Sequence, residues 1–350
     1  MPKVRLLSLF GVALALLALA SRERPTFPRP EELTLGYIPV AFLMHFAAAD
    51  EKGWFRDDLG VQVEYVSFPT GVPLLQAVAA GQIDVAYIGV GPALTLAHRG
   101  VPYKIVAATA RDGFGVVAAS KFADIYTRNP TAGAFTEFQR QQGRNLKIAS
   151  PPKGTNVDII LRLWLTRLGL NPERDVEIVR LAGEEKFIPA LVSEAVDAFI
   201  FPEPHITLAL RSDPKNKVIW WNQETFPNTV STVVMVKQSL IDQYPEMMEK
   251  LVEIHLRANK LFKEDREYWA RVTARMVGEE RVPLDIVRQA ISGPGANSVG
   301  NPRGAVDAIV LFDQFLVQDG TYPAVIRAEN MFDFRFYDRV VLRHPELEDS

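Results

Sequence analysis

The sequence contains an internal repeat, and this repeat constrains the fold more than any other feature. Residues 33–94 and residues 145–207 each read strand, helix, strand, helix, strand. Within the two best-matching stretches, Asp84 and Asp197 lie 113 positions apart. Two similar α/β halves on one chain predict two lobes with a cleft between them, and such clefts are common places for small ligands to bind.

Strands and helices alternate through both halves, which favours parallel, doubly wound sheets and an α/β fold class. Strands are expected at 33–38, 61–68, 83–88, 103–109, 115–120, 146–150, 175–181, 196–201, 218–221 and 229–236. Helices are expected at 41–51, 71–80, 156–168 and 186–194, then at 241–262, 268–277 and 283–291 on the outside of the first lobe. The polar stretch 121–143 is expected to be loop with one short helix.

The pattern also predicts where the chain divides. Residues 33–110 and 232–350 would form the first lobe, and residues 111–231 the second. The chain would cross between the lobes near 110–113 and again near 227–231. Two crossings favour closure about a hinge over independent movement of the lobes.

The N-terminal segment has the pattern of a secretion signal. Lys3 and Arg5 precede an uncharged apolar run over 6–19, and Ala18-Leu19-Ala20 has the form of a cleavage site. Residues 1–20 are therefore predicted to be a signal peptide, and 21–32 a proline-containing linker. A retained membrane anchor is the alternative, although the run is short for a bilayer span. The protein is expected in the periplasm or another extracytoplasmic space.

Composition excludes several classes of function. The formal net charge is −3 and the chain has no run of basic residues, so nucleic acid is not expected as a partner. The chain has no cysteine, which excludes disulfides, thiol catalysis and Cys-ligated metals. It lacks the G-x-S-x-G, H-E-x-x-H, P-loop and dinucleotide-binding motifs, so no catalytic residue, metal or cofactor is predicted.

Candidate ligand contacts follow the predicted strands, because open α/β sheets bind ligands beyond the carboxyl ends of their strands. In the first lobe the candidates are Pro39, Phe42, His45, Thr70, Gly71, Gly89 and Gly91. Glycine lets a ligand approach the backbone, and a helix N-terminus offers free N–H groups to an anionic group. Each glycine alone has a structural explanation, since turns need glycine anyway.

In the second lobe the candidates are Lys153, Gly154, Thr155, Asn156, Glu203 and His205. Thr155 with Asp158 also fits a helix capping box, which is a purely structural role. Glu203 would accept hydrogen bonds from a ligand, and His205 could donate or accept them.

Short motifs along residues 33–240 resemble the periplasmic substrate-binding proteins of ABC importers, in the nitrate/sulfonate/taurine family. The motifs that carry this resemblance are Gly36-Tyr37-Ile38-Pro39, Ala48-Ala49-Asp50-Glu51-Lys52-Gly53-Trp54-Phe55, Gly60-Val61-Gln62-Val63, Ala80-Gly81-Gln82-Ile83-Asp84-Val85-Ala86, Leu168-Gly169-Leu170, Asp175-Val176, Val196-Asp197-Ala198 and Glu203-Pro204. The chain departs from the family pattern at Glu194, which stands opposite Gly81 where glycine is usual.

The resemblance implies a type II periplasmic-binding-protein fold whose lobes close on one small molecule. The implied function is a monomeric receptor that delivers its solute to an ABC permease in the membrane. The solute would be an organic anion, a zwitterion or a heterocycle. The alternative is an enzyme on the same two-lobe fold, of the menaquinone- or thiamine-pathway type.

Overall fold

The computed structural model describes residues 30–40, 43–295 and 297–349. The predicted signal peptide, most of the predicted linker and Phe42 lie outside these ranges. Residues Glu31–Ser350 form one compact unit. The boundaries given above for the two lobes therefore stay a prediction, and we use "lobe" below for each sheet together with the helices packed on it.

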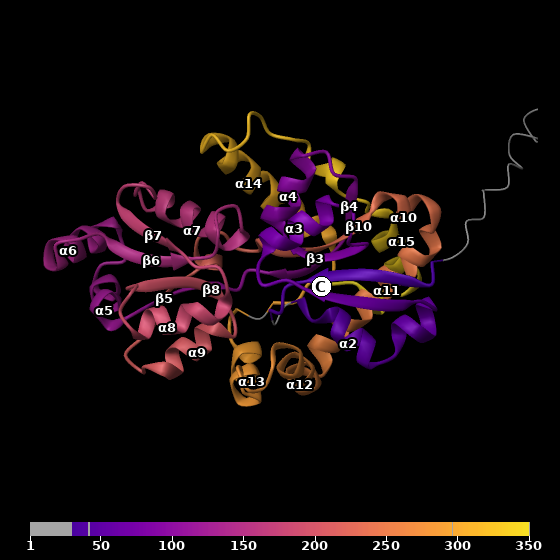
Figure 1. Cartoon of the computed structure of the whole chain (residues 1–350), viewed down its shortest axis with the longest axis horizontal. Helices are drawn as coiled ribbons and strands as arrows, with labels where there is room; N and C mark the ends of the chain where they lie inside the picture. Colours follow the sequence, from indigo (N-terminus) through magenta and orange to yellow (C-terminus); the bar gives the residue numbers. More distant parts are fainter. Residues whose placement is uncertain (1–29, 41–42, 296, 350) are drawn as a thin grey trace, which may run out of the picture. The chain divides into compact units, whose positions relative to one another are not determined.

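Two five-stranded sheets form the framework of this unit (Figure 1). The first has the order β2-β1-β3-β10-β4 and the second the order β7-β6-β8-β5-β9. The strands of the first sheet are β1 (Glu32–Tyr37), β2 (Gln62–Ser67), β3 (Val85–Gly89), β4 (Tyr103–Arg111) and β10 (Val230–Lys237). Those of the second sheet are β5 (Phe114–Ala118), β6 (Leu146–Ser150), β7 (Val176–Arg180), β8 (Ala198–Pro202) and β9 (Lys217–Trp221).

Each sheet is mixed rather than wholly parallel, which corrects the sequence-based expectation. In the first sheet β1 pairs in parallel with β2 and β3, but β10 runs antiparallel to both β3 and β4. In the second sheet β5 runs antiparallel to β8 and β9. The antiparallel strand is in each case the one that enters from the other sheet, because a strand that follows a crossing arrives from the opposite direction.

The repeat seen in the sequence is also present in the hydrogen bonds. The Asp84 carboxylate accepts from the Thr34 backbone N–H at 3.1 Å, and the Asp197 carboxylate accepts from the Lys147 N–H at 2.9 Å. These two bonds occupy the same place in the two halves, 113 positions apart. Each aspartate thus ties the start of one strand to its neighbour in the sheet.

Helices cover both faces of each sheet (Figure 1). α3 and α4 lie on one side of the first sheet and α2 and α11 on the other, while α7 is separated from α8 and α9 by the second sheet. The helices in the first half of the chain are α2 (His45–Glu51), α3 (Gly71–Ala79), α4 (Val90–His98), α5 (Ser120–Arg128), α6 (Ala132–Gln142), α7 (Asn156–Arg167), α8 (Phe187–Val192) and α9 (His205–Ser212). Those that follow are α10 (Gln238–Gln243), α11 (Pro245–Glu264), α12 (Arg266–Val277), α13 (Leu284–Ser292), α14 (Ala305–Gln318) and α15 (Arg335–Arg343).

Three helical regions differ from the expectation. The stretch 121–143 forms two helices, α5 and α6, because Phe122, Phe135 and Phe138 bury an apolar face that the polar composition concealed. The expected helix 241–262 is divided in two, since Pro245 starts α11. The third difference is that the expected helices did not include α9, α14 or α15.

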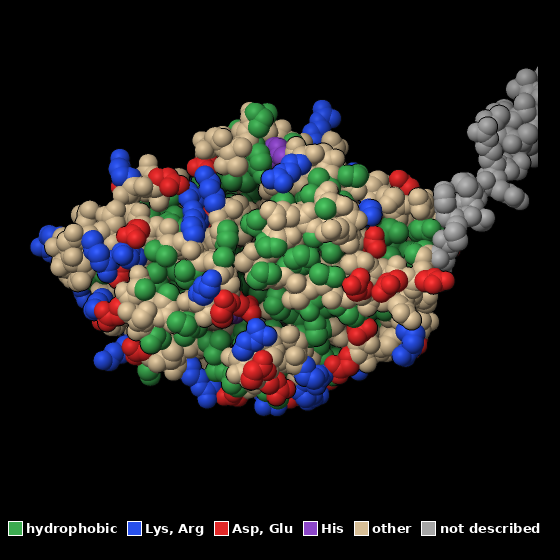
Figure 2. Space-filling model, viewed as in Figure 1, with side chains coloured by type: hydrophobic (Ala, Val, Ile, Leu, Met, Phe, Trp, Pro, Cys, Tyr) green, Lys and Arg blue, Asp and Glu red, His purple; other side chains and the backbone are tan. Residues whose placement is uncertain are grey.

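Charged side chains of both signs are interspersed on the face seen in Figure 2, without a large patch of one sign. In the described part of the chain, no helix is both long enough and apolar enough to span a membrane.

Candidate functional site

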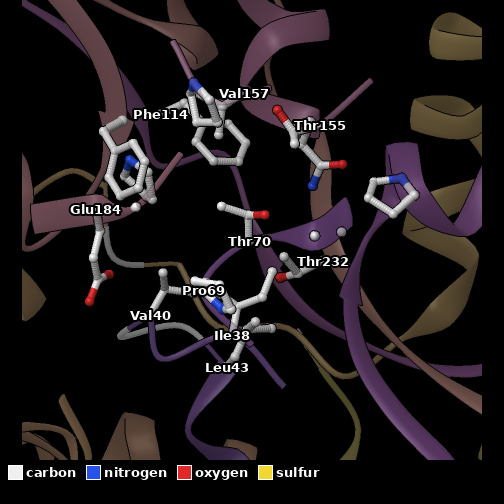
Figure 3. A pocket seen from close by; sticks show the side chains of 18 of the residues that line it. Ile38, Val40, Leu43, Pro69, Thr70, Phe114, Thr155, Val157, Glu184 and Thr232 are labelled. Atoms are coloured by element: carbon white, nitrogen blue, oxygen red, sulfur yellow. The ribbon is translucent and has the colours of Figure 1, made fainter. Parts of the chain in front are cut away.

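A cavity of about 90 Å³ lies where loops of the two lobes meet. Its lining residues come from the carboxyl ends of strands and the starts of the helices that follow them, in both sheets (Figure 3). This is the position that open α/β sheets use for ligands. The lining residues are Ile38, Val40, Leu43, Pro69, Thr70, Gly71, Gly89, Pro92, Phe114, Pro151, Thr155, Asn156, Val157, Leu181, Gly183, Glu184, Phe187, Phe201, Pro202 and Thr232.

The internal repeat extends into this lining. Five pairs of lining residues stand 113 positions apart and occupy matching places in the two lobes. The pairs are Ile38 with Pro151, Leu43 with Asn156, Thr70 with Gly183, Gly71 with Glu184, and Gly89 with Pro202. The cavity is therefore built from equivalent strand ends of the two halves.

Five of the predicted contacts line the cavity: Thr70, Gly71, Gly89, Thr155 and Asn156. Figure 3 shows Thr70 near the centre of the view, with Thr155 on one side and Glu184 on the other. Thr70 precedes α3, and its side chain does not cap that helix. Its hydroxyl therefore stays available to a ligand.

Asn156 connects the two lobes. Its Oδ1 accepts from the Gly91 backbone N–H at 2.6 Å, and its Nδ2 donates to the Ser231 carbonyl. Gly89 makes this approach possible, because a Cβ at that position would lie 2.6 Å from Asn156 Nδ2. Gly91 thus contacts the second lobe through its backbone and is not part of the cavity lining.

Thr155 has the capping role that the sequence suggested. Its hydroxyl accepts from the Asp158 N–H at 3.3 Å and donates to the Pro152 carbonyl at 3.0 Å. The Asp158 carboxylate accepts from the Gly154 N–H at 3.2 Å, which places Gly154 in the turn before α7 and outside the cavity lining. Lys153 also lies outside it, because its Nζ pairs with Asp319 of the first lobe at 3.2 Å.

The structure does not bring His45 to the cavity. The ring is fully buried on α2, where its Nε2 bonds Ser298 Oγ at 2.8 Å and its face packs against His255 and Trp269. Burial and the nearby His255 lower its pKa well below the ordinary value, so the ring is neutral. Pro39 lies between two lining residues, Ile38 and Val40, without lining the cavity itself.

Glu203 and His205 also lie outside the cavity lining. The Glu203 carboxylate is turned into the protein, where it accepts from the Thr207 N–H at 3.0 Å and the Thr207 hydroxyl at 3.1 Å at the start of α9. His205 packs edge-on against Phe201 and lines a separate cavity between α9 and α13. Burial raises the pKa of Glu203 to about 7 and lowers that of His205 to about 4.

Comparison with known proteins identifies the family. A model of the NMT1-like family matches residues 27–278, which is more than half of the chain. The chain belongs to the NMT1-like family.

Among individual relatives, the nitrate import ATP-binding protein NrtC of Synechococcus elongatus is 26% identical over 238 residues, covering 67% of this chain and 35% of that protein. The Synechocystis protein of the same name is 24% identical over 317 residues, which cover 86% of this chain and 44% of that protein. This chain therefore spans less than half the length of these two relatives.

Solved structures confirm the predicted fold class. The periplasmic nitrate-binding protein NrtA from Synechocystis PCC 6803 matches with a TM-score of 0.76 at 16% identity, covering 92% of both chains. The alkanesulfonate-binding protein SsuA from Xanthomonas axonopodis pv. citri, bound to MOPS, matches with a TM-score of 0.71 at 17% identity, covering 88% of this chain and 100% of that one. The NMT1-like chain thus has the two-lobed periplasmic-binding-protein fold.

Glu184 is the lining residue that the sequence analysis most clearly missed. It follows β7 and starts the short 3-10 helix Glu184–Lys186 that leads into α8, and it is the one ionisable side chain among the described lining residues. The repeat itself contained the signal, because Thr70 and Gly71 correspond to Gly183 and Glu184. The aromatic lining residues Phe114, Phe187 and Phe201 were missed because a buried strand or helix position looks the same in sequence whether or not it borders a cavity.

Proposed function

We propose that this protein is an exported receptor that captures a small solute between its lobes and delivers it to an ABC permease. The observation that carries the proposal is the cavity lined by equivalent strand-end loops of both halves. A solute held there contacts both lobes only when they are close together. Binding therefore stabilises the closed form by its differential affinity for that form.

The relatives support a receptor over an enzyme. The solved structures that match along most of both chains are those of a nitrate-binding and an alkanesulfonate-binding protein, and the sequence relatives include named import components. The proposal includes action as a monomer outside the cytoplasm, with a membrane anchor if the N-terminal segment is retained. Within the cavity, we propose Thr70, Gly71, Gly89, Thr155 and Asn156 as ligand contacts.

A thermal-shift screen of the exported protein tests this function. The panel comprises nitrate, sulfonates, amino acids, polyamines and small heterocycles, and at least one solute should raise the melting temperature in a concentration-dependent way. The variant Thr70→Phe places a ring in the cavity and should abolish the response. Thr166→Phe, on the exposed side of α7, is the matched control and should keep it. A panel without a hit, or a hit that Thr70→Phe leaves unchanged, would contradict the proposal.

A further inference from the structure

The charge of the cavity lining points away from an anionic solute. Among the described residues that line it there is no lysine, arginine or histidine, and Glu184, which also borders the cavity between α9 and α13, is the ionisable residue. Two nearby basic side chains are already paired, Lys153 with Asp319 and Arg180 with Asp158. An oxyanion bound here would lose its hydration without gaining a cationic partner.

The helix N-termini around the cavity also offer few free N–H groups to an anion. Helix N-termini bind anions through free N–H groups of their first turn. Proline is the third residue of α3 and of α4, at Pro73 and Pro92, and so removes one donor from each. In α4 the Gly91 N–H is already bound to Asn156 Oδ1.

The third N-terminus, that of α7, is occupied by its own side chains. Thr155 accepts from the Asp158 N–H, and the Asp158 carboxylate places a negative charge in the first turn. This carboxylate takes the position in the helix dipole that a bound anion would otherwise use.

Few polar side chains of the described lining residues remain free for a ligand. Asn156 and Thr155 are engaged as described above, and the Thr232 hydroxyl bonds the Thr109 hydroxyl. The Thr70 hydroxyl and the Glu184 carboxylate remain. The loops at Thr70 and Glu184, which are equivalent in the internal repeat, therefore supply the two free polar side chains of the described lining.

Among the described residues, no lysine or arginine forms an ion pair with Glu184. His205 is near its carboxylate, with 3.8 Å between Glu184 Oε2 and His205 Nε2. His205 is neutral near pH 7, because burial lowers its pKa to about 4. Burial raises the pKa of Glu184 to about 7, against the opposing effect of Arg281. A hydrogen-bond donor on the solute would satisfy this carboxyl group, and a cation would do so most strongly.

The remaining walls are apolar and close together. Phe114, Phe187 and Phe201 line the cavity with Val157 and Leu181. The three aromatic walls favour contact with a flat ring. The cavity encloses about 90 Å³, less than the roughly 150 Å³ of a cavity that takes up benzene, so it encloses only part of such a solute.

From these observations we infer that the solute is a small, ring-bearing molecule, neutral or cationic, whose N–H or O–H donor binds Glu184, and that oxyanions are excluded. This inference rests on the proposed receptor function and adds the chemical class of its ligand. Glu184 is then the residue that determines specificity.

Three probes with the same ring and different charge test the inference: benzylamine, benzyl alcohol and benzenesulfonate, with nitrate as a fourth. Calorimetry on the exported protein should give an affinity for benzylamine at least tenfold above that for benzenesulfonate, and no binding of nitrate. Glu184→Gln should weaken benzylamine at least tenfold and benzyl alcohol less than threefold. Glu185→Gln, the exposed neighbouring carboxylate, is the control and should change neither.

The outcomes separate this inference from the receptor function. Tighter binding of benzenesulfonate or nitrate than of benzylamine would overturn the ligand class and leave the receptor function intact. Equal effects of Glu184→Gln on the charged and neutral probes would overturn the role of Glu184. Failure of all three ring probes, alongside an anionic hit in the thermal-shift screen, would also overturn the inference. Failure of every solute in both experiments would instead count against the receptor function.

Discussion

Glu203 illustrates how one side chain can have a structural role where the sequence suggested a ligand contact. It is 3% exposed, and its carboxyl group accepts two hydrogen bonds from Thr207. These bonds favour the charged form, but desolvation outweighs them and raises the pKa from 4.5 to about 7. The folded protein therefore holds the Glu203 proton more tightly than the unfolded chain does.

This shift predicts a pH-dependent stability. Because the pKa of Glu203 is raised on folding, its contribution is fully present below about pH 4.5 and is lost as pH rises through about 7. Glu203→Gln keeps an acceptor for Thr207 and removes the titration. The free energy of unfolding of the wild type, minus that of the variant, should fall between pH 5 and pH 8 by up to about 3 kcal/mol.

Urea denaturation of both proteins at the two pH values measures this difference. Glu184 and His205 titrate in the wild type and the variant alike, so their contributions cancel. A difference that stays constant with pH would show that Glu203 is not held protonated by the fold.

At the scale of elements, the two lobes approach each other closely where α4 contacts α7. Asn156 at the start of α7 is 5% exposed and bonds the backbone at both Gly91 and Ser231. Gly89, with a φ of −70°, has a backbone that any residue can adopt. Glycine is needed there for space, since a Cβ would lie 2.6 Å from the Asn156 amide.

We therefore expect Gly89→Ala to lower the free energy of unfolding by about 1–3 kcal/mol, because it displaces Asn156 and leaves buried backbone groups unpaired. The double variant with Asn156→Ala tests the cause. If the clash is with Asn156, Gly89→Ala should cost much less in the Asn156→Ala background. Additive effects of the two substitutions in urea denaturation would contradict this explanation.

In the molecule as a whole, the two crossings between the sheets are tied to each other. Asp112 in the first crossing accepts from the Thr229 N–H at 3.0 Å and from Asn222 Nδ2 at 3.3 Å in the second. Asp112 and Gly113 have φ of 58° and 88°, and Asn228 has a φ of 61°. Tight, paired crossings of this kind allow rotation of one lobe against the other and restrict other motions.

The absence of native cysteine allows this motion to be measured directly. Spin labels at Thr127→Cys on α5 and Leu342→Cys on α15, both exposed, report the separation of the lobes. The solute found by the thermal-shift screen should shorten the distance between these labels. The pair Thr127→Cys and Thr166→Cys lies within the second lobe and should not change. An unchanged distance between α5 and α15 at saturating solute would exclude hinge closure on binding.

Much of the fold could be predicted from the sequence, because it depends on local patterns that the chain carries in full. Alternating strands and helices predicted all ten strands to within a few residues, and the 113-residue offset predicted two equivalent halves. The two halves differ in sequence at Glu194, which stands opposite Gly81, but the backbone conformation is the same. Glu194 has a φ of 57° and Gly81 a φ of 73°, so both are left-handed. The antiparallel direction of β5 and β10 was not predicted, since strand direction depends on the path of the chain between sheets.

The site was predictable only as a set of loops. The local sequence pattern predicts where each strand ends, and the repeat predicts which strand ends are equivalent. Together they predict that Thr70, Gly89 and Asn156 lie near one another. The direction of each side chain depends on partners far away in the chain: His45 bonds Ser298, 253 residues later. Tertiary packing buries the side chains of His45 and Glu203, which find hydrogen-bond partners inside the protein, and leaves Glu184 at the cavity. The sequence alone does not show which partners lie near a side chain, and buried polar groups need such partners.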